Sequence, residues 1–299
     1  MRLREFELKN PTKYRLDVFL ASQLEESRAG VQKLIKCGLV KVDGEPVKAS
    51  MKLKAGSKVT VELPLPPKID ALPEDLPLDI VYDDEELAVI NKSAGMVVHP
   101  AVGNWTGTLV NALLFKKRPE ANQDKLRPGI VHRLDKDTSG VMVVAWTAKA
   151  HAYLSNQFKA RTVKKIYYAL STGSFKNKEG TINLPIGRST RDRKKMMVNA
   201  PVAREAVTMY KVIKDLKDAA LVEVTLKTGR THQIRVHLAH IRHPVMGDAV
   251  YGKKDERMPR QALHCGLLGF KHPVTGKFME FTAELPEDMK AAMEELKQA

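Results

Sequence analysis

Residues 130 to 145 read Ile130-Val-His132-Arg133-Leu-Asp135-Lys136-Asp137-Thr138-Ser139-Gly140-Val141-Met-Val-Val-Ala145. The five apolar residues at the end of this stretch predict a buried strand. The polar residues before them then lie at the entrance of that strand. Arg133 and Lys136 neighbour Asp135, and nearby cations favour the ionised carboxylate. The stretch therefore predicts a nucleophile or base at Asp135, or else a turn braced by side-chain hydrogen bonds.

The composition is that of a globular protein that binds a polyanion. The chain has 299 residues, of which 43% are hydrophobic and 28% charged, enough for two domains and a sizeable core. Its formal net charge of +15 predicts nucleic acid or an anionic membrane as partner, or more simply a basic solvated surface. Because the chain shows no apolar run long enough for a bilayer and no basic amphipathic helix with an aromatic face, nucleic acid is favoured and no membrane association is expected.

The N-terminus lacks the apolar core of a signal peptide. The two cysteines, Cys37 and Cys265, are too few for a disulfide framework or a thiolate metal site. We expect both to be reduced, in a cytoplasmic protein.

A proline-rich stretch divides the chain. Five of the 16 prolines fall between residues 64 and 77, which predicts a semi-extended linker over 64–78. It separates an N-terminal domain, 13–63, from a large C-terminal domain, 79–299.

The N-terminal domain reads as two helices followed by short strands. Helical spacing of apolar residues covers 14–24, and a second helix begins with Ser27 as its cap and ends at Gly38. The second helix has a polar face that carries basic residues, which either bind RNA or form an ordinary solvated face. The candidate RNA-binding residues are Arg28, Lys33 and Lys36.

The C-terminal domain mixes strands and helices without a repeating βαβ order. This order predicts an α+β domain around a mixed, largely antiparallel sheet, and not a doubly wound fold. One helix is expected to begin at a Thr231 cap and to run to about Arg242, before Pro244. Residues 187–204 read as a basic loop that grips an RNA backbone, with the candidates Arg191, Arg193 and Lys194.

A second polar string, residues 226–237, reads Leu226-Lys-Thr-Gly229-Arg230-Thr231-His232-Gln233-Ile234-Arg235-Val236-His237. Arg235 falls in the first turns of the expected helix, where packing can hold a guanidinium rigidly for a forked pair with a carboxylate. The alternative is that Arg235 braces the sheet. Arg230 is expected to contact phosphate or to shape the turn.

The string His132-Arg-Leu-Asp135-Lys-Asp-Thr-Ser-Gly140 resembles the catalytic motif of the RluA-type RNA pseudouridine synthases, and the string around Arg235 is similar to their third motif. The resemblance implies that Asp135 is the nucleophile and that Arg235 pairs with it. It also implies that Tyr167, in Lys164-Lys-Ile-Tyr167-Tyr168, stacks on the target base and is a candidate general base. His132, Arg133, Leu226 and Arg230 are the expected substrate-binding residues.

Weaker matches to the same family cover other stretches. Residues 91–95 resemble the first motif, in which the family usually has proline where this chain has Ser93, and a changed turn there would affect support of the site. Residues 247–252 also match, although a turn or sheet edge is the simpler interpretation. The N-terminal domain resembles the S4 RNA-binding module.

Two other chemistries were weighed against this resemblance. Four histidines, at 232, 237, 240 and 243, suggest a metal, but their spacing is not that of a zinc protease helix. Asp135 and Asp137 could form a glycosidase pair, but carboxylates two residues apart in one loop seldom straddle a glycosidic bond, and Asp137 more simply holds the turn. No metal is expected.

The resemblance implies an isomerase that converts uridines in RNA to pseudouridine and that needs no cofactor. Large-subunit ribosomal RNA or its precursor particles are the expected substrate, with transfer RNA as the alternative. Competing hypotheses are a non-catalytic RNA-binding or ribosome-assembly factor and a hydrolase. We expect a monomer.

Overall fold

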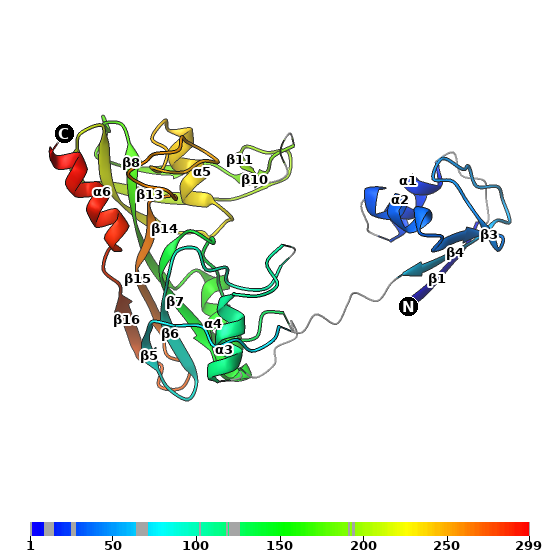
Figure 1. The fold of residues 1–299 in the computed structure, drawn as a ribbon, viewed down its shortest axis with the longest axis horizontal. Helices are drawn as coiled ribbons and strands as arrows, with labels where there is room; N and C mark the ends of the chain where they lie inside the picture. The colour runs from blue at the N-terminus through cyan, green and yellow to red at the C-terminus, as the bar shows by residue number, and fades with distance from the viewer. Residues whose placement is uncertain are drawn as a thin grey trace. The chain divides into compact units, whose positions relative to one another are not determined.

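The computed structural model describes residues 2–8, 15–24, 28–63, 71–101, 103–117, 119, 126–190, 192 and 195–298. The chain divides into two compact units, one up to residue 69 and one from residue 70 (Figure 1).

The first unit is a four-stranded antiparallel sheet, in the order β1-β4-β2-β3, with two helices. Gly38 ends α2 with a φ of 72°, and Asp43 and Gly44 turn the chain with φ values of 53° and 87°, as a tight hairpin turn requires. The elements are β1 (Arg2–Glu7), α1 (Leu16–Gln23), α2 (Arg28–Lys36), β2 (Val40–Val42), β3 (Glu45–Pro46) and β4 (Lys58–Leu63).

Strand β1 extends this unit beyond the range 13–63 that the sequence predicted. Arg2 to Glu7 pair in register with Leu63 to Lys58 along the whole of β4. The predicted cap Ser27 lies outside the described residues, and the described part of α2 begins at Arg28.

The second unit is built on a sheet of nine described strands, in the order β5-β6-β7-β15-β8-β14-β13-β9, with β16 paired to β15. Only the β7–β15 pair is parallel among the described strands, which confirms the predicted mixed, largely antiparallel α+β fold. The strands are β5 (Ile80–Asp83), β6 (Leu87–Lys92), β7 (Ser139–Ala145), β8 (Lys164–Thr172), β9 (Glu179–Asn183), β13 (Val207–Leu216), β14 (Ala219–Leu226), β15 (Leu263–Lys271) and β16 (Phe278–Thr282).

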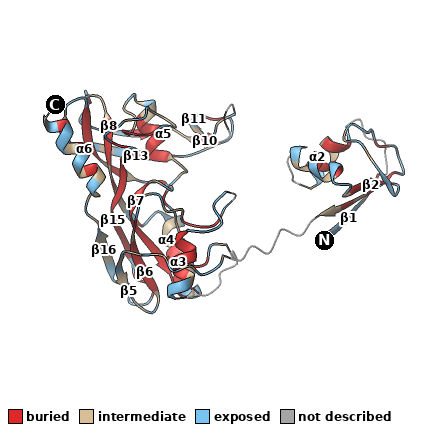
Figure 2. Ribbon diagram, in the orientation of Figure 1, coloured by how far each residue is buried: buried red, intermediate tan, exposed pale blue. Residues whose placement is uncertain are grey.

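Both faces of this sheet are covered, and β7 near its centre is buried along its whole length (Figure 2). In β7, Met142 and Val144 join one apolar core while Val141 and Val143 join another, because successive side chains of a strand point to opposite faces. The helices are α3 (Leu109–Lys116), α4 (Ala148–Ala160), α5 (Gln233–His240) and α6 (Glu287–Gln298).

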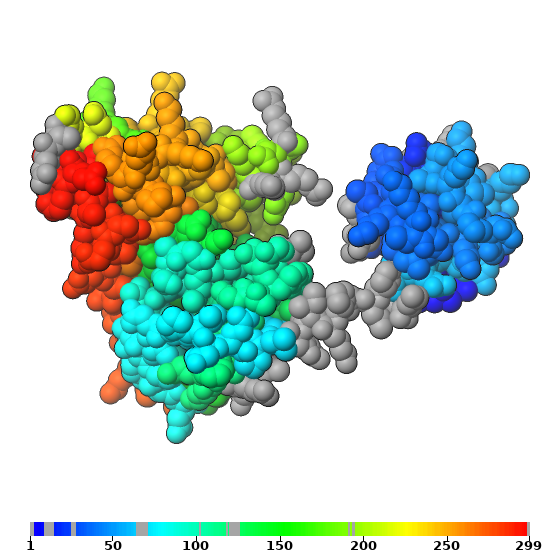
Figure 3. All heavy atoms as spheres, viewed as in Figure 1, coloured from blue at the N-terminus to red at the C-terminus, as the bar shows by residue number. Residues whose placement is uncertain are grey.

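The helices divide between the two cores. Helices α3, α5 and α6 contribute buried residues to the core of Met142, and α4 contributes to the core of Val141. Helix α6 lies at the surface of this unit, where its outer residues form the red group of spheres in Figure 3. No described helix is long and apolar enough to cross a membrane.

The described part of the proline-rich stretch packs on the second unit. The Glu74 amide donates to the Asn111 carbonyl at 3.0 Å, and the Asn111 side chain donates to the Leu72 carbonyl at 2.7 Å. Leu78 packs against the apolar core. Residues 71–78 are therefore attached along α3, whereas a linker had been expected over 64–78.

The segment 187–204 is not the simple loop that the sequence predicted. It belongs to a three-stranded antiparallel sheet in the order β11-β10-β12. The predicted RNA-binding residues Arg191, Arg193 and Lys194 lie outside the described residues. The strands are β10 (Ile186–Arg188), β11 (Met196–Val198) and β12 (Ala203–Arg204).

Gly140 allows β7 and β15 to run side by side. Its φ is 117°, and a Cβ at this position would lie 2.2 Å from the Cys265 carbonyl oxygen. We expect Gly140→Ala to lower the free energy of unfolding of the second unit by at least about 2 kcal/mol, because strain and clash add. Gly276→Ala, with a φ of 66° and no atom near its Cβ, is the control and should cost about 1 kcal/mol.

Tryptophan fluorescence in urea measures both variants, since the chain's two tryptophans, Trp105 and Trp146, lie in the second unit. Equal losses in the two variants would mean that β15 shifts to make room at Gly140.

Candidate active site

The loop that precedes β7 is held through its main chain. Residues 135–137 present three successive carbonyl groups, and each accepts a hydrogen bond. The donors are the amides of Thr138 and Gly95, the ammonium of Lys92 and the guanidinium of Arg260, at distances of 2.9–3.1 Å. The Asp135 side chain therefore projects from a main chain that is fixed on three consecutive residues.

Lys92 supports this loop from within the protein. Its side chain is 1% exposed, and its ammonium donates to the carbonyls of Ser93, Met96 and Lys136 at 2.7, 3.0 and 3.0 Å. Burial lowers the pKa of Lys92 to about 8, so the ammonium is still mainly protonated at pH 7. The stretch 91–95 thus supports the site by tying its own turn to the Asp135 loop.

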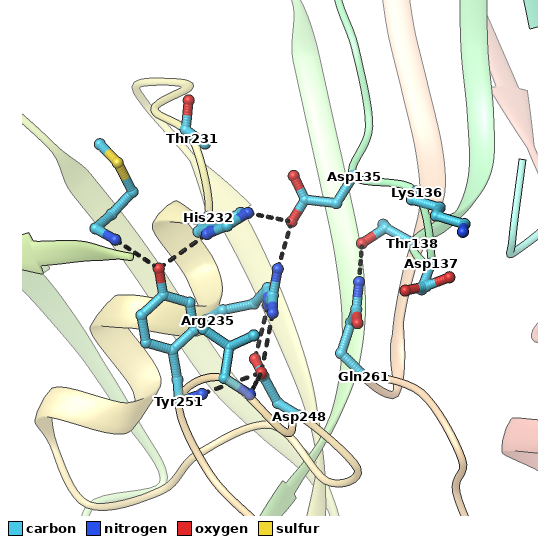
Figure 4. A network of polar contacts seen from close by, with 12 residues as sticks. Asp135, Lys136, Asp137, Thr138, Thr231, His232, Arg235, Asp248, Tyr251 and Gln261 are labelled. Atoms are coloured by element: carbon cyan, nitrogen blue, oxygen red, sulfur yellow. Dashed lines mark hydrogen bonds and ion pairs between the residues drawn. The ribbon is translucent and has the colours of Figure 1, made fainter. Parts of the chain in front are cut away.

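Arg235, on α5, joins two carboxylates (Figure 4). Its Nη1 donates to Asp135 Oδ2 at 3.0 Å, while Nε and Nη2 donate to Asp248 Oδ2 and Oδ1 at 2.7 and 2.9 Å. The guanidinium is thus held by a forked pair on one side and presents its remaining edge to Asp135 on the other. The structure brings together Asp135 and Arg235, which are 100 residues apart in the chain.

Asp248 is the residue of this group that the sequence argument passed over. Its side chain is fully buried, and Oδ1 also accepts the amides of Val250 and Tyr251. Burial acts to raise the pKa of Asp248, but the hydrogen bonds and charge of Arg235 outweigh it and the pKa is lowered. The available signal was the family match at 247–252, for which a turn seemed sufficient; the turn is present, and its first carboxylate holds Arg235.

Asp135 lies in a pocket that opens onto a larger groove. The carboxylate is 25% exposed. The pocket encloses about 60 Å³ and the adjoining groove about 570 Å³, and both are lined by Arg133, Asp135, Tyr167, Leu226 and Arg230. Four of the predicted site residues therefore surround the predicted nucleophile, and Arg235 lines the smaller pocket beside it.

Tyr167 lies on β8 between β14 and β15, where it pairs with Val224 and Cys265. Its ring is almost fully buried and forms one wall of the pocket. Burial, the neighbouring Cys265 and the charge of Asp135 raise the pKa of Tyr167 well above its usual range. The phenol is thus protonated at neutral pH, and no tyrosinate is ready to act as a base in the unliganded protein.

The start of α5 differs from the predicted one. The helix begins at Gln233, and its N-terminal flanking residue is His232, which has a φ of 56° and makes no capping bond. Thr231, the predicted cap, instead accepts a hydrogen bond from the exposed Arg133 at 3.3 Å. The prediction was wrong because His232, immediately before the helix, has a left-handed backbone conformation. The sequence Thr231-His232 carries no signal of that conformation.

Two of the predicted substrate-binding residues form side-chain hydrogen bonds to the main chain of the protein. His132 accepts the Val143 amide on Nε2 at 3.0 Å and stacks on Phe158, and burial lowers its pKa to about 3. Arg230 donates from Nε to the Glu205 carbonyl at 2.9 Å. Both still line the groove, so they shape its surface while their polar atoms hold neighbouring segments.

The groove carries cations that the sequence did not single out. They come from the end of α4, from β8 and from the segment after β14, which meet only in the folded chain. These residues are Lys159, Arg161, Lys165 and Lys227. With Arg133 and Arg230 they give six cations against one lining carboxylate, Asp135, which suits a phosphate backbone.

The predicted RNA-binding residues of the first unit have two different environments. Arg28 donates to the buried carboxylate of Asp17 at 3.1 Å, together with Arg15 and Gln32. Burial acts to raise the pKa of Asp17, but these donors lower it to about 2. Arg28 therefore ties α2 to α1, whereas Lys33 and Lys36 are exposed.

Three of the four histidines of the 232–243 segment have different partners, and His240 is exposed. His237 is buried between the Thr208 hydroxyl and the Leu184 carbonyl, and His243 stacks on Phe175. The side chain of Asp137 points away from Arg235 and Asp135 (Figure 4). Neither arrangement resembles a shared metal site or a facing carboxylate pair.

Asp248→Asn tests the support of Arg235. Because it leaves a buried guanidinium short of its partner, we expect the free energy of unfolding of the second unit at pH 7 to fall by about 3 kcal/mol. The pKa of Asp248 is lowered by folding, so its contribution is complete above the unfolded carboxyl pKa of about 3.9 and is lost at lower pH. Urea unfolding at several pH values should therefore show the difference from wild type shrinking below about pH 4.

Asp255→Asn is the matched control, because Asp255 also forms a forked pair, with the exposed Arg257. It should cost less than about 1 kcal/mol. A similar loss in both variants would contradict the supporting role of Asp248.

Comparisons with known proteins identify the family of the chain and its two domains. The family model of RNA pseudouridylate synthase matches residues 86–240, and that of the S4 domain matches residues 15–59. The solved structure of human RNA Pseudouridylate Synthase Domain Containing 1 has a TM-score of 0.60 and 26% identity, and the match covers 76% of this chain and 90% of that one.

Two bacterial relatives span nearly the whole chain. An RNA pseudouridine synthase of Bacillus subtilis, YlyB, is 47% identical over 286 residues, 95% of this chain and 94% of that protein. The ribosomal large subunit pseudouridine synthase D of Zymomonas mobilis is 44% identical over 292 residues, 93% of this chain and 92% of that protein. The resemblance seen in the sequence is thereby confirmed: the chain belongs to the RNA pseudouridine synthase family and carries an N-terminal S4 domain.

Proposed function

We propose that this enzyme converts specific uridines of large-subunit ribosomal RNA to pseudouridine, with Asp135 as the nucleophile. The observation that carries the assignment of Asp135 is its position: a quarter-exposed carboxylate in a pocket, held by a guanidinium that a buried second carboxylate fixes. A purely structural ion pair would not need to be open to a basic groove.

The two oxygens of Asp135 differ. Arg235 binds Oδ2, and among the described residues Oδ1 receives no hydrogen bond or ion pair. We assign Oδ1 as the attacking atom. It forms a bond to the flipped nucleoside as the N-glycosidic bond breaks, and the bonding electron pair leaves with the uracil.

The rest of the reaction is an exchange within one nucleotide. The detached uracil turns in the pocket and its C5 bonds to the ribose. The bond between Asp135 Oδ1 and the nucleoside breaks and restores the carboxylate, the C5 proton is lost, and N1 ends protonated. Substrate and product contain the same atoms. Arg133, exposed at the rim of the pocket, is our candidate to occupy the space that the flipped base vacates.

Tyr167 contributes the wall on which the uracil lies. Its ring is buried beside Asp135, and its neutral phenol can accept a hydrogen bond. The general-base role predicted from sequence would first require the phenol to lose its proton, against the shift that burial imposes on its pKa.

Ribosomal RNA is the proposed substrate because of the relatives and the S4 domain. Relatives from Zymomonas mobilis and Xanthomonas campestris, 44% and 42% identical over more than nine-tenths of this chain, are named ribosomal large subunit pseudouridine synthase D. A cytoplasmic location follows from such a substrate. The monomeric state stays a prediction. The molar mass from light scattering during size-exclusion chromatography tests it.

Pseudouridine mapping in cells with and without the protein tests the substrate. We expect a small set of sites in large-subunit ribosomal RNA to disappear without it. Loss of sites in transfer RNA alone would replace the proposed substrate. An in vitro assay of tritium release from RNA labelled at uridine C5 tests the reaction itself, and release of free uracil instead would indicate a hydrolase.

Asp135→Asn tests the nucleophile. The amide keeps the size of the side chain but is a poor nucleophile, so we expect pseudouridine formation to fall by at least about a thousandfold while RNA binding and unfolding stay near wild type. Asp137→Asn, two residues away with its side chain turned aside, should retain activity. Normal product formation by Asp135→Asn would remove it from the mechanism.

Lysines of the groove should contribute to RNA binding through phosphate charge. We expect Lys159→Gln and Lys227→Gln each to weaken binding and to reduce the slope of log affinity against log salt by about 0.7, the value for one phosphate contact on a single strand. Filter binding between low and high salt measures both quantities. Lys290→Gln, on α6 and outside the groove, should leave the slope unchanged.

A further inference from the structure

His232 lies between Asp135 and a partly buried chain of hydrogen bonds through Tyr251 (Figure 4). Its Nδ1 is 2.8 Å from the Tyr251 hydroxyl, and its Nε2 is 3.8 Å from Asp135 Oδ2. The Met196 amide donates to the Tyr251 hydroxyl at 2.8 Å. Four residues from four segments of the chain, 135, 196, 232 and 251, are thus arranged in a line that ends at Asp135.

The hydrogen bonds of this chain favour one position for the proton of His232. The Met196 amide can only donate, so the Tyr251 oxygen accepts. The phenolic proton of Tyr251 is then free to be donated to Nδ1, and in this arrangement Nδ1 accepts. A neutral imidazole whose Nδ1 accepts carries its hydrogen on Nε2, the atom that faces Asp135.

The surroundings of His232 favour the neutral ring. Burial lowers the pKa of His232, the positive charges of Arg235 and Arg133 act in the same direction, and the carboxylates Asp135 and Asp248 oppose them. The net direction is downward, so the imidazole is mainly neutral at pH 7. A neutral ring can donate to Asp135 without cancelling the negative charge on which nucleophilic attack depends.

We propose that His232 positions the nucleophile by donating its Nε2–H to Asp135 Oδ2 when RNA is bound. The inference rests on the proposed role of Asp135. At 3.8 Å the contact is open in the unliganded protein, as bonds in active sites often are before substrate binds. With Arg235 and His232 both on Oδ2, the carboxylate cannot rotate freely, and Oδ1 is directed into the pocket.

The backbone of His232 supports this assignment. Its φ of 56° is a left-handed conformation that is uncommon for residues other than glycine. The His232 side chain makes no capping hydrogen bond to α5. This conformation aims the ring at Asp135 and Tyr251 rather than at the end of the helix.

The same chain connects the nucleophile to the small sheet of β10 and β11. Met196 opens β11, and Tyr251 packs with it in the apolar cluster beneath that sheet. This sheet carries the basic segment for which an RNA contact was predicted. If a change at β11 weakened the Met196–Tyr251 hydrogen bond, Tyr251 would no longer hold the His232 proton on Nε2. The hydrogen bond that His232 donates to Asp135 would then be weakened.

The first experiment reads the ring directly. We would record ¹⁵N spectra of the imidazoles in the full-length protein and assign His232 by its loss in His232→Gln. We expect the Nε2–H form at pH 7, and a shift toward a mixture of the two neutral forms in Tyr251→Phe, which keeps the ring but removes the hydroxyl. The Nδ1–H form in wild type, or no response to Tyr251→Phe, would overturn the proposal.

The second experiment measures pseudouridine formation under single-turnover and steady-state conditions. His232→Leu, which has no donor, should lower kcat by about tenfold to a hundredfold with little change in KM for RNA. His232→Gln, whose amide can donate from a similar place, should recover much of the loss. Because Tyr251 acts through His232, Tyr251→Phe should lower kcat less in the His232→Leu background than in wild type.

His240→Gln is the control, since His240 is exposed on the same helix. Wild-type kcat in His232→Leu, together with an inactive Asp135→Asn, would reject the role of His232 and keep the nucleophile. Full activity of Asp135→Asn would instead reject the proposed nucleophile, and the spectra would still decide whether Tyr251 sets the proton of His232.

Discussion

The forked pair between Arg235 and Asp248 is the interaction on which the site depends. It neutralises a guanidinium and a carboxylate that burial would otherwise disfavour, and it uses two of the three guanidinium nitrogens. The third is left to bind Asp135 in one direction only. A lysine could not replace this arginine, because a single ammonium has no planar fork that binds one carboxylate in two places and presents a separate edge to another.

Asp135, the proposed nucleophile, is held from both ends. Its side chain meets Arg235, and its main chain lies in a loop whose carbonyls bind Lys92, Gly95, Thr138 and Arg260. Most of these donors come from segments far from residue 135, so the loop takes its shape from the packed domain. Rigidity of this kind allows a carboxylate to be partly exposed and still aimed.

The sheet explains why the site and the groove meet. Tyr167 on β8 and the Asp135 loop before β7 flank β15, and the segment after β14 brings Arg230 and α5 to the same edge. Cations from the end of α4, from β8, from the loop before β7 and from the segment after β14 are thereby gathered beside one carboxylate. In the proposed function the groove binds the phosphate backbone and the pocket receives a single base, which is the division that modification of one nucleotide in a long RNA requires.

The sequence by itself determined the buried strand after Gly140, the α+β class, the family, and the expectation that Asp135 and Arg235 would meet. These features rest on local patterns: apolar runs, turn residues and long motifs. Only the tertiary structure decided that Asp248 holds Arg235 and that His232, not Thr231, directly precedes α5. It also decided that strands within residues 187–204 pair in a small sheet. The groove likewise exists only in the folded chain, where it brings together Lys159, Lys165 and Lys227. Each of these depends on contacts between residues distant in the chain, and burial, which gives such contacts their strength, is a property of the packed domain that no local pattern contains.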